Sequence, residues 1–250
     1  VPVAVFSLEM SSSQLVQRLV AAESELSAEK FRKGDLEEYE YQQLQSRITK
    51  LAKAKLFIDD TPALSVFELR AKCRRLKQKH GINMVIIDYL QLMTAGGENS
   101  SKGNREQEIS TISRSIKSIA KELDVPVIAL SQLSRSVETR GGDKRPILSD
   151  LRESGAIEQD ADIVCFIYRP EYYGITEDAD GIDTENMGEL IVAKHRNGGL
   201  DTVKLKFTKH LAKFSDYDAF ADSPFDNGGA MAPNENFANA GAKTMTVGSR

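Results

Sequence analysis

Hydrophobic and polar residues alternate along this chain in blocks whose lengths predict strands and helices in turn. Largely apolar runs of strand length occur at residues 1–7, 84–92 and 125–130, and such runs between turn residues are typical of strands buried on both faces. Before the last run, apolar residues recur every three or four positions, at Ile109, Ile112, Ile116, Ile119 and Leu123. This spacing predicts an amphipathic helix packed on a sheet. The alternation predicts an α/β fold with a mostly parallel sheet and helices on both faces.

Two further helices are marked at their beginnings by capping boxes. In this pattern a serine and a residue three positions later each accept a hydrogen bond from the other's backbone amide. Ser11 with Gln14 and Ser65 with Glu68 fit the pattern. Residues 27–55 are dense in Glu, Lys and Gln around a thin apolar stripe, so they predict helices at the surface.

The last third of the chain predicts strands of a different kind. Apolar strands are expected at residues 162–168 and 189–193, and the alternating pattern at 202–207, followed by 212–214, predicts an antiparallel β finish. Residues 134–145 are basic and contain glycine, which is typical of an exposed, mobile loop.

Residues beyond the last predicted strand change in composition. From about residue 221 the chain consists largely of Gly, Asn, Ala and Ser without any period, a composition that cannot bury enough apolar surface to fold. We therefore expect one domain over residues 1–220 and a disordered tail over residues 221–250.

Composition excludes several classes of protein. The chain has 250 residues, of which 40% are hydrophobic and 28% charged, as in ordinary soluble globular proteins. A net charge of −4 gives no overall sign of nucleic-acid binding, so any such role needs a local basic surface. No apolar run approaches the roughly 20 residues that span a bilayer, so we expect no membrane association. The two cysteines, Cys73 and Cys165, form no CxxC pair, which fits a reducing cytoplasm.

Three polar side chains follow the ends of predicted strands, namely Glu9, Asp88 and Gln132. Because the carboxyl ends of parallel strands meet at one sheet edge, we expect them to converge. Transfer of a phosphoryl group to water needs a carboxylate that holds magnesium, a second that orients or deprotonates the water, and a polar group near the γ-phosphate. The three residues therefore predict an ATPase-type site. Taken singly, Asp88 also fits a loop cap, and Glu9 fits an acid favoured by a helix N-terminus.

Two cations stand at the end of the strand predicted at residues 189–193. Lys194 and Arg196 occupy alternate positions, which places both side chains on the same face of a strand. They fit either a solvated pair at a turn or an arginine-finger pair that reaches a neighbouring subunit's γ-phosphate. Their spacing does not decide between the two.

Five segments, in this order, carry a resemblance to a known family. They are VFSLEMS (Val5–Ser11), IIDYLQL (Ile86–Leu92), ALSQLSR (Ala129–Arg135), DLRESG with IEQDAD (Asp150–Asp162), and AKHRNG (Ala193–Gly198). Over roughly residues 1–215 the chain resembles the C-terminal RecA-like motor domain of bacterial replicative DNA helicases of the DnaB type. The resemblance implies a P-loop NTPase core in a hexameric ring that moves along single-stranded DNA while it hydrolyses ATP with Mg²⁺. It also implies primase and a helicase loader as partners.

The resemblance assigns roles by position. Glu9 looks like the catalytic glutamate that activates water, and Asp88 like the Walker B aspartate, which holds magnesium through water. Gln132 looks like the polar sensor that couples the γ-phosphate to the DNA loops. Lys194 and Arg196 match the pair that reaches into the next subunit's site.

A further segment matches the family's DNA contacts. Arg152, Glu153 and Gly155 look like the loop that holds the DNA backbone in the central channel. A ring would also account for the acidic composition, because only the lining of its channel needs to be basic.

One family motif is missing from the 250 residues. The Walker A pattern GxxxxGK[ST], whose amides and lysine cradle the phosphates, does not occur. We expect it to lie just before Val1 in a longer helicase that also has an N-terminal collar domain, and we expect the isolated chain to be inactive. Two alternatives stay open. One is a RecA-like recombination or repair ATPase, and the other is a non-catalytic DNA-binding or assembly module.

Overall fold

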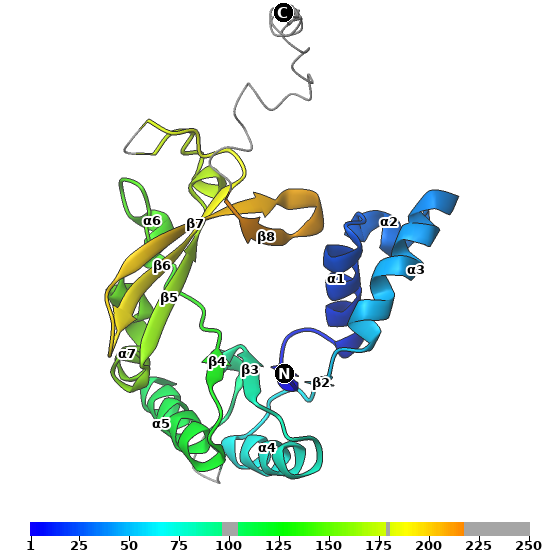
Figure 1. Ribbon diagram of the computed structural model, residues 1–250. Coiled ribbons are helices and arrows are strands. Elements are labelled where there is room, and N and C mark those ends of the chain that lie inside the picture. The colour runs from blue at the N-terminus through cyan, green and yellow to red at the C-terminus, as the bar shows by residue number, and fades with distance from the viewer. Residues whose placement is uncertain (97–104, 179–180, 218–250) are drawn as a thin grey trace, which may run out of the picture. The chain divides into compact units, whose positions relative to one another are not determined.

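The structure is a computed structural model (Figure 1) that describes residues 1–96, 105–178 and 181–217. The side chains of residues 152–154 also lie outside the described part. Residues Val1–Asp216 form one compact unit. The tail expected over residues 221–250 falls outside the described residues.

The elements follow one another as the hydrophobic pattern predicts. In chain order they are β1 (Val3–Ser7), α1 (Ser12–Ser24), α2 (Ala28–Lys33), α3 (Glu38–Ala52), β2 (Leu56–Asp59), α4 (Val66–His80), β3 (Met84–Asp88), η1 (Leu90–Leu92), α5 (Arg105–Leu123), β4 (Val127–Ala129), α6 (Ser136–Thr139), η2 (Leu148–Ser154), α7 (Gly155–Asp160), β5 (Ile163–Tyr168), η3 (Pro170–Tyr173), β6 (Met187–His195), β7 (Asp201–Thr208), η4 (Lys209–Leu211) and β8 (Lys213–Asp216). Both predicted capping boxes are confirmed, at the starts of α1 and α4. Among the described residues no helix is long and apolar enough to span a bilayer.

The first sheet is parallel throughout, in the order β2-β1-β3-β4. Its crossovers run through α1–α3, α4 and α5 in turn, which confirms the predicted α/β alternation. Helices α4 and α5 lie side by side along β3 and β4 (Figure 1). Phe6 and Ile87 of the sheet are fully buried, and the isoleucines of α5 are buried in the same apolar core. Burial of these apolar side chains holds the parallel sheet and its helices together.

The second sheet is antiparallel, in the order β5-β6-β7-β8. The predicted antiparallel finish is confirmed, and it begins earlier than expected, at β5. Along β5 every second side chain is buried, with Val164, Phe166 and Tyr168 inside and Ile163 and Ile167 more than half exposed. One covered face is typical of antiparallel sheets.

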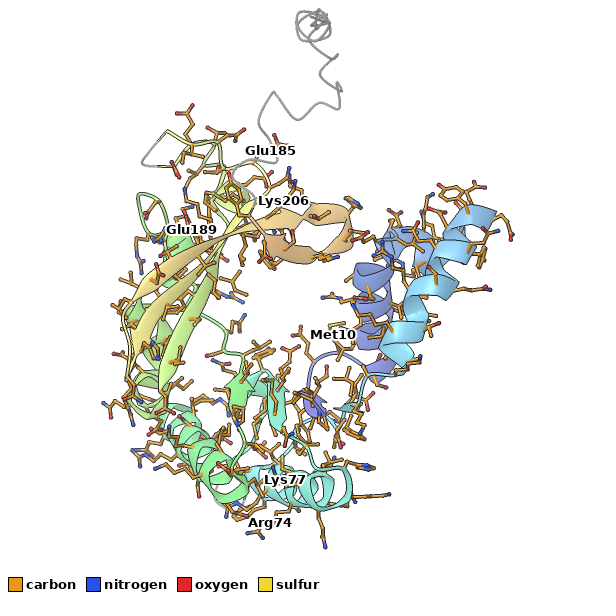
Figure 2. All side chains as sticks on the ribbon, in the orientation of Figure 1. Met10, Arg74, Lys77, Glu185, Glu189 and Lys206 are labelled. Atoms are coloured by element: carbon orange, nitrogen blue, oxygen red, sulfur yellow. The ribbon has the colours of Figure 1, made fainter. Side chains whose placement is uncertain are left out.

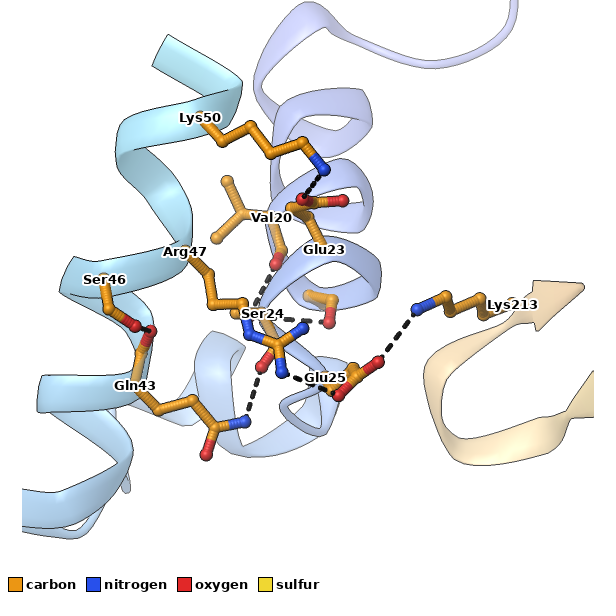
Figure 3. A network of polar contacts seen from close by, with 10 residues as sticks. Val20, Glu23, Ser24, Glu25, Gln43, Ser46, Arg47, Lys50 and Lys213 are labelled. Atoms are coloured by element: carbon orange, nitrogen blue, oxygen red, sulfur yellow. Dashed lines mark hydrogen bonds and ion pairs between the residues drawn. The ribbon is translucent and has the colours of Figure 1, made fainter. Parts of the chain in front are cut away.

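Helices α1 and α3 are joined by polar contacts at the end of α1 (Figure 3). Glu25, the C-cap residue that follows α1, pairs with Arg47 of α3 at 3.2 Å and with Lys213 of β8 at 3.1 Å. The side chain of Gln43 donates to the carbonyl oxygen of Ser24 at 2.7 Å. These contacts tie α1 to α3 and to the antiparallel sheet.

Candidate active site

Two acidic residues, Glu9 and Asp88, lie at the edge of the parallel sheet where its strands end. Ser7 of β1 lies beside Asp88 of β3 in the strand register, and the amide of Leu8 donates to the carbonyl oxygen of Asp88 at 2.7 Å. Glu9 follows Leu8 directly and is exposed. The next residue, Met10, lies in the segment that leads from β1 to α1 (Figure 2). The two acids predicted to converge therefore come from neighbouring strands in the fold, although they are far apart in the sequence.

The electrostatics of this edge favour a cation. Partial burial and the negative charge of Glu9 raise the pKa of Asp88, and the positive charge of Arg18 offsets part of that rise. Among the described residues no hydrogen bond reaches the Asp88 carboxylate, which argues against its being a loop cap. Carboxylate oxygens suit Mg²⁺, which commonly takes one or two protein carboxylates together with substrate phosphates. The donor set fits that ion.

The acids at the end of β2 have structural partners instead. Asp59 accepts hydrogen bonds from Lys72 at 2.7 and 2.8 Å. Burial raises the pKa of Asp59, but the bonds from Lys72 and Thr61 outweigh it and lower the pKa overall. Asp60 accepts a hydrogen bond from the amide of Ser12 at 2.8 Å. That bond lowers the pKa of Asp60 and fixes the start of α1 close behind Glu9.

Gln132 lies at the corresponding end of β4 and is exposed. It is positioned by Gln91, a residue that the sequence did not single out. The side-chain oxygen of Gln91 accepts from the amide of Gln132 at 3.2 Å, and its amide group donates to Ser131 Oγ at 2.9 Å and to the Gln132 carbonyl at 3.3 Å. Gln91 thus ties the segment after β3 to the segment after β4.

The sequence conceals Gln91 because the apolar run of residues 84–92 continues beyond the strand. As expected, β3 ends at Asp88, and the rest of the run, Leu90–Leu92, forms a 3-10 turn. The amide of Leu90 already bonds to the carbonyl of Leu130, beyond the end of β4. A glutamine three positions after a strand-end acid is the only sequence signal for this role, and it is a weak one.

Lys194 and Arg196 lie in the antiparallel sheet, at the end of β6. Within the described part of the chain, no hydrogen bond or ion pair joins either of them to Glu9, Asp88 or Gln132. The structure therefore brings three of the five predicted catalytic residues to one sheet edge and places the other two elsewhere.

Both cations rest on the C-terminal end of α7. Lys194 Nζ donates to the carbonyl oxygens of Ala161, at 2.9 Å, and Glu158. Arg196 donates to the carbonyl oxygen of Gln159 at 3.1 Å and pairs with Asp162 at 3.4 Å. Helix C-termini carry partial negative charge, so this end of α7 attracts the pair.

The predicted DNA-contacting residues lie between η2 and α7. Gly155 is the exposed first residue of α7, and an added Cβ there would meet open space. The side chains of Arg152 and Glu153 lie outside the described residues, so only their place in η2 is known.

Replacement of Asp88 by asparagine is expected to stabilise the folded chain near neutral pH. Because the folded-state pKa is raised above the unfolded value, the ionised carboxylate destabilises the fold above the folded pKa. That penalty disappears as the pH falls to about 3.9, the unfolded value. Solvent screening limits the gain to less than about 1 kcal/mol, and 1 kcal/mol corresponds to about 2–4 °C in melting temperature for a domain of this size. Thermal unfolding of Asp88→Asn without magnesium, at pH 7 and pH 3.5, measures it; destabilisation at pH 7 would instead indicate a loop cap.

The family model for the DnaB-like helicase C terminal domain matches residues 1–216. Over 212 residues the chain is 54% identical to replicative DNA helicase DnaB of Geobacillus stearothermophilus, covering 85% of this chain and 45% of that protein. The chain thus spans somewhat less than half the length of this curated relative.

Two solved structures share the fold. A DnaB-like replicative helicase, solved to describe its interactions with primase, is 40% identical with a TM-score of 0.78, covering 87% of this chain and 51% of that one. The second is a structure of an ATPase domain. It is also 40% identical with a TM-score of 0.78, covering 87% of this chain and 75% of that one.

Proposed function

This chain belongs to the family of DnaB-like helicase C-terminal domains, and from that premise we propose that it is the ATP-driven motor of a replicative DNA helicase. The observation that carries the proposal is the acid pair of Glu9 and Asp88 at the carboxyl edge of the parallel sheet, with Gln132 at the end of β4. Such edges hold ligands in open α/β folds. The proposed motor domain covers residues 1–220, with 221–250 as a tail.

Each residue at this edge has a separate role in the proposal. Asp88, whose carboxylate lacks a hydrogen-bonding partner among the described residues, holds Mg²⁺ through water. Glu9 is exposed and adjacent, so it orients the attacking water and accepts its proton. Gln132, fixed through its backbone by Gln91, places its side chain towards the γ-phosphate. When bound, Mg²⁺ would supply positive charge beside the acid pair, and ATP would supply the phosphoryl group to be transferred.

Lys194 and Arg196 are proposed to act on the site of a neighbouring subunit in a hexameric ring. Their separation from Glu9 and Asp88 within one chain supports this role. Arg196 has an exposed partner in Asp162, since their side chains are 50% and 54% accessible. Ion pairs of that kind contribute little to stability, so Arg196 can exchange Asp162 for a phosphate at small cost.

The proposed partners follow from the same family membership. Arg152, Glu153 and Gly155 are assigned to single-stranded DNA in the central channel. Primase and a helicase loader are proposed as protein partners, and the DnaB-like helicase whose primase interactions were solved shares this fold.

A chimera tests the function directly. Residues 1–216 of this chain replace the matched segment of the Geobacillus stearothermophilus helicase. We expect the chimera to unwind forked DNA and to hydrolyse ATP at about 1 s⁻¹ or faster, the ordinary range for enzymes. The isolated chain of 250 residues serves as the control. It should neither hydrolyse ATP nor bind it at micromolar concentration, because it contains no GxxxxGK[ST] pattern to cradle the phosphates.

The outcomes separate the alternatives. Hydrolysis and DNA binding without unwinding would favour a recombination or repair ATPase. A folded chimera that binds DNA but neither hydrolyses ATP nor unwinds would favour a non-catalytic module. Micromolar ATP binding by the isolated chain, measured by titration calorimetry, would contradict the expected need for a separate phosphate cradle.

A further inference from the structure

Residues 134–150, which include the basic segment after β4, form a loop that is closed at the buried residue Asp150. The amide of Ser134 donates to the carbonyl oxygen of Asp150 at 2.9 Å, so the residues between them begin and end at the same place. The side chain of Asp150 is 2% exposed, which is rare for a carboxylate without partners. The segment predicted as a mobile loop also contains α6 and is held from inside.

The Asp150 carboxylate holds two more points of the loop. One oxygen accepts a hydrogen bond from the amide of Ile147 at 2.8 Å, and the other pairs with the guanidinium of Arg140. Arg140 in turn donates to the carbonyl oxygen of Arg145 at 3.1 Å. Removing one partner of a buried ion pair leaves the other charge uncompensated. The shape of the loop therefore depends on the charge of Asp150.

A second buried acid fastens the far side of the loop to the antiparallel sheet. Arg145 pairs with Glu189, which lies on β6 (Figure 2) and is 5% exposed. The guanidinium of Arg145 also lies over the ring of Tyr168, 5.7 Å from its centroid. The hydroxyl of Tyr168 donates to the carbonyl oxygen of Asp143. Loop and sheet thus form one packed unit.

The closing bond lies midway between two proposed functional segments. Gln132, assigned to the γ-phosphate, stands two residues before Ser134, and Arg152, assigned to DNA, stands two residues after Asp150. Leu133 and Leu151 pack into the same apolar cluster beneath β5 and β6. Two segments that are separated in the sequence by the whole loop are therefore joined by one hydrogen bond and one shared core.

We propose that Asp150 is a positioning residue that couples the nucleotide-facing end of β4 to the DNA-contacting segment. The inference rests on the proposed function. Asp150 touches neither nucleotide nor DNA in this role. Its charge keeps the loop closed, so that a displacement of the DNA-contacting segment moves Gln132, and a displacement of Gln132 moves the DNA-contacting segment.

Asp150→Asn tests the proposal in the chimera. Asparagine keeps an acceptor for the Ile147 amide but gives up the charge opposite Arg140. We expect the DNA-stimulated hydrolysis rate to fall about tenfold and the affinity for a dT oligonucleotide to fall by a similar factor. A tenfold loss lies within the range of interaction energies found for residues in contact. The basal rate without DNA should stay within about twofold of the unsubstituted chimera.

Asp143→Asn is the matched control. Asp143 lies in the same loop and is exposed, and its carboxylate accepts only from the amide of Arg145, at 3.1 Å, among the described residues. The same chemical change there should leave both the basal and the DNA-stimulated rates unaltered. A parallel loss in both variants would show a general effect of removing acid from the loop and would overturn the assignment to Asp150.

A double-mutant cycle with Arg140→Gln separates positioning from direct DNA contact. If Arg140 acts through Asp150, the double variant should be no weaker than either single one; if Arg140 binds DNA itself, the losses should add. In the 250-residue chain, hydrogen exchange should show faster exchange at the amides of Ser134 and Ile147 in Asp150→Asn and in Arg140→Gln, but not in Asp143→Asn. Arg140→Gln also keeps the test decisive if Asp150→Asn fails to fold.

Two outcomes would overturn the inference. One is a normal DNA-stimulated rate in a variant whose loop amides have lost protection, and the other is an unchanged exchange pattern at these amides. An unsubstituted chimera without DNA-stimulated hydrolysis would instead contradict the proposed function, so the two failures are distinguishable.

Discussion

Glu9→Gln is expected to lower ATP hydrolysis in the chimera by about 10²–10⁴-fold, the usual contribution of a general base, while nucleotide binding is retained. Glutamine keeps the size and position of the side chain but cannot accept a proton from water. The structure places Glu9 in the open, directly beyond β1 and near enough to Asp88 for its charge to raise the pKa of that acid. Steady-state hydrolysis and titration with a fluorescent nucleotide measure the two quantities separately.

The control for this variant is Glu23→Gln. Glu23 is an acid of α1, the helix that follows Glu9, and it pairs with Lys50 at 3.3 Å. Its substitution therefore removes an acid from a neighbouring element without touching the strand edge. Turnover in Glu9→Gln close to that of the control would rule out the role of general base. It would leave Glu9 as a charge favoured by the N-terminus of α1, worth about 0.3–1 kcal/mol to stability.

Arg196→Ala should lower hydrolysis by about 10³–10⁵-fold in the assembled ring, the range found for arginine fingers. Its guanidinium rests on α7 and Asp162 in the single chain, so the variant should fold normally and bind nucleotide normally. Arg114→Ala, which removes an exposed arginine from α5, is the control and should retain full activity.

Mixing subunits tests whether Arg196 acts across an interface. In a ring of mixed subunits, some interfaces have both groups intact. There, a Glu9→Gln subunit supplies Arg196 and its Arg196→Ala neighbour supplies Glu9. Random mixing in equal amounts produces such interfaces at about a quarter of all positions in a cyclic assembly. The mixture should therefore hydrolyse ATP well above either variant alone. A mixture as inactive as its components would place Arg196 in the site of its own chain or outside the chemistry.

Much of the fold was predictable because the apolar pattern reports burial. The isoleucines of α5 recur at helical spacing and are buried, and the parallel sheet follows from the alternation of strands and helices. The pattern does not report how many faces of a strand are covered. The run of residues 163–168 is apolar throughout, yet Ile163 and Ile167 are more than half exposed, so the antiparallel character of β5 was not visible in the sequence.

The candidate site was predictable only where a residue's place in the chain determines its place in the fold. Glu9, Asp88 and Gln132 follow strand ends, and the sheet brings strand ends together. Gln91 and Asp150 acquire their roles mainly from partners that are distant in the sequence. No local pattern indicates such partners. Apart from the pair of Arg196 with Asp162, the side chains of Lys194 and Arg196 contact main-chain carbonyls in and just after α7, and carbonyl groups have no signature in a sequence.

The pairing of Glu25 with Arg47 and Lys213 (Figure 3) makes part of this molecule responsive to ionic strength. The sheets are held by apolar burial, which moderate salt leaves intact. The Glu25 contacts join half-exposed charges, and the Debye length falls from about 10 Å at 0.1 M to about 3 Å at 1 M. In concentrated electrolyte the antiparallel sheet would keep its own structure while its electrostatic tether to the end of α1 loosens. The surrounding salt therefore adjusts how firmly the helices behind Glu9 are held.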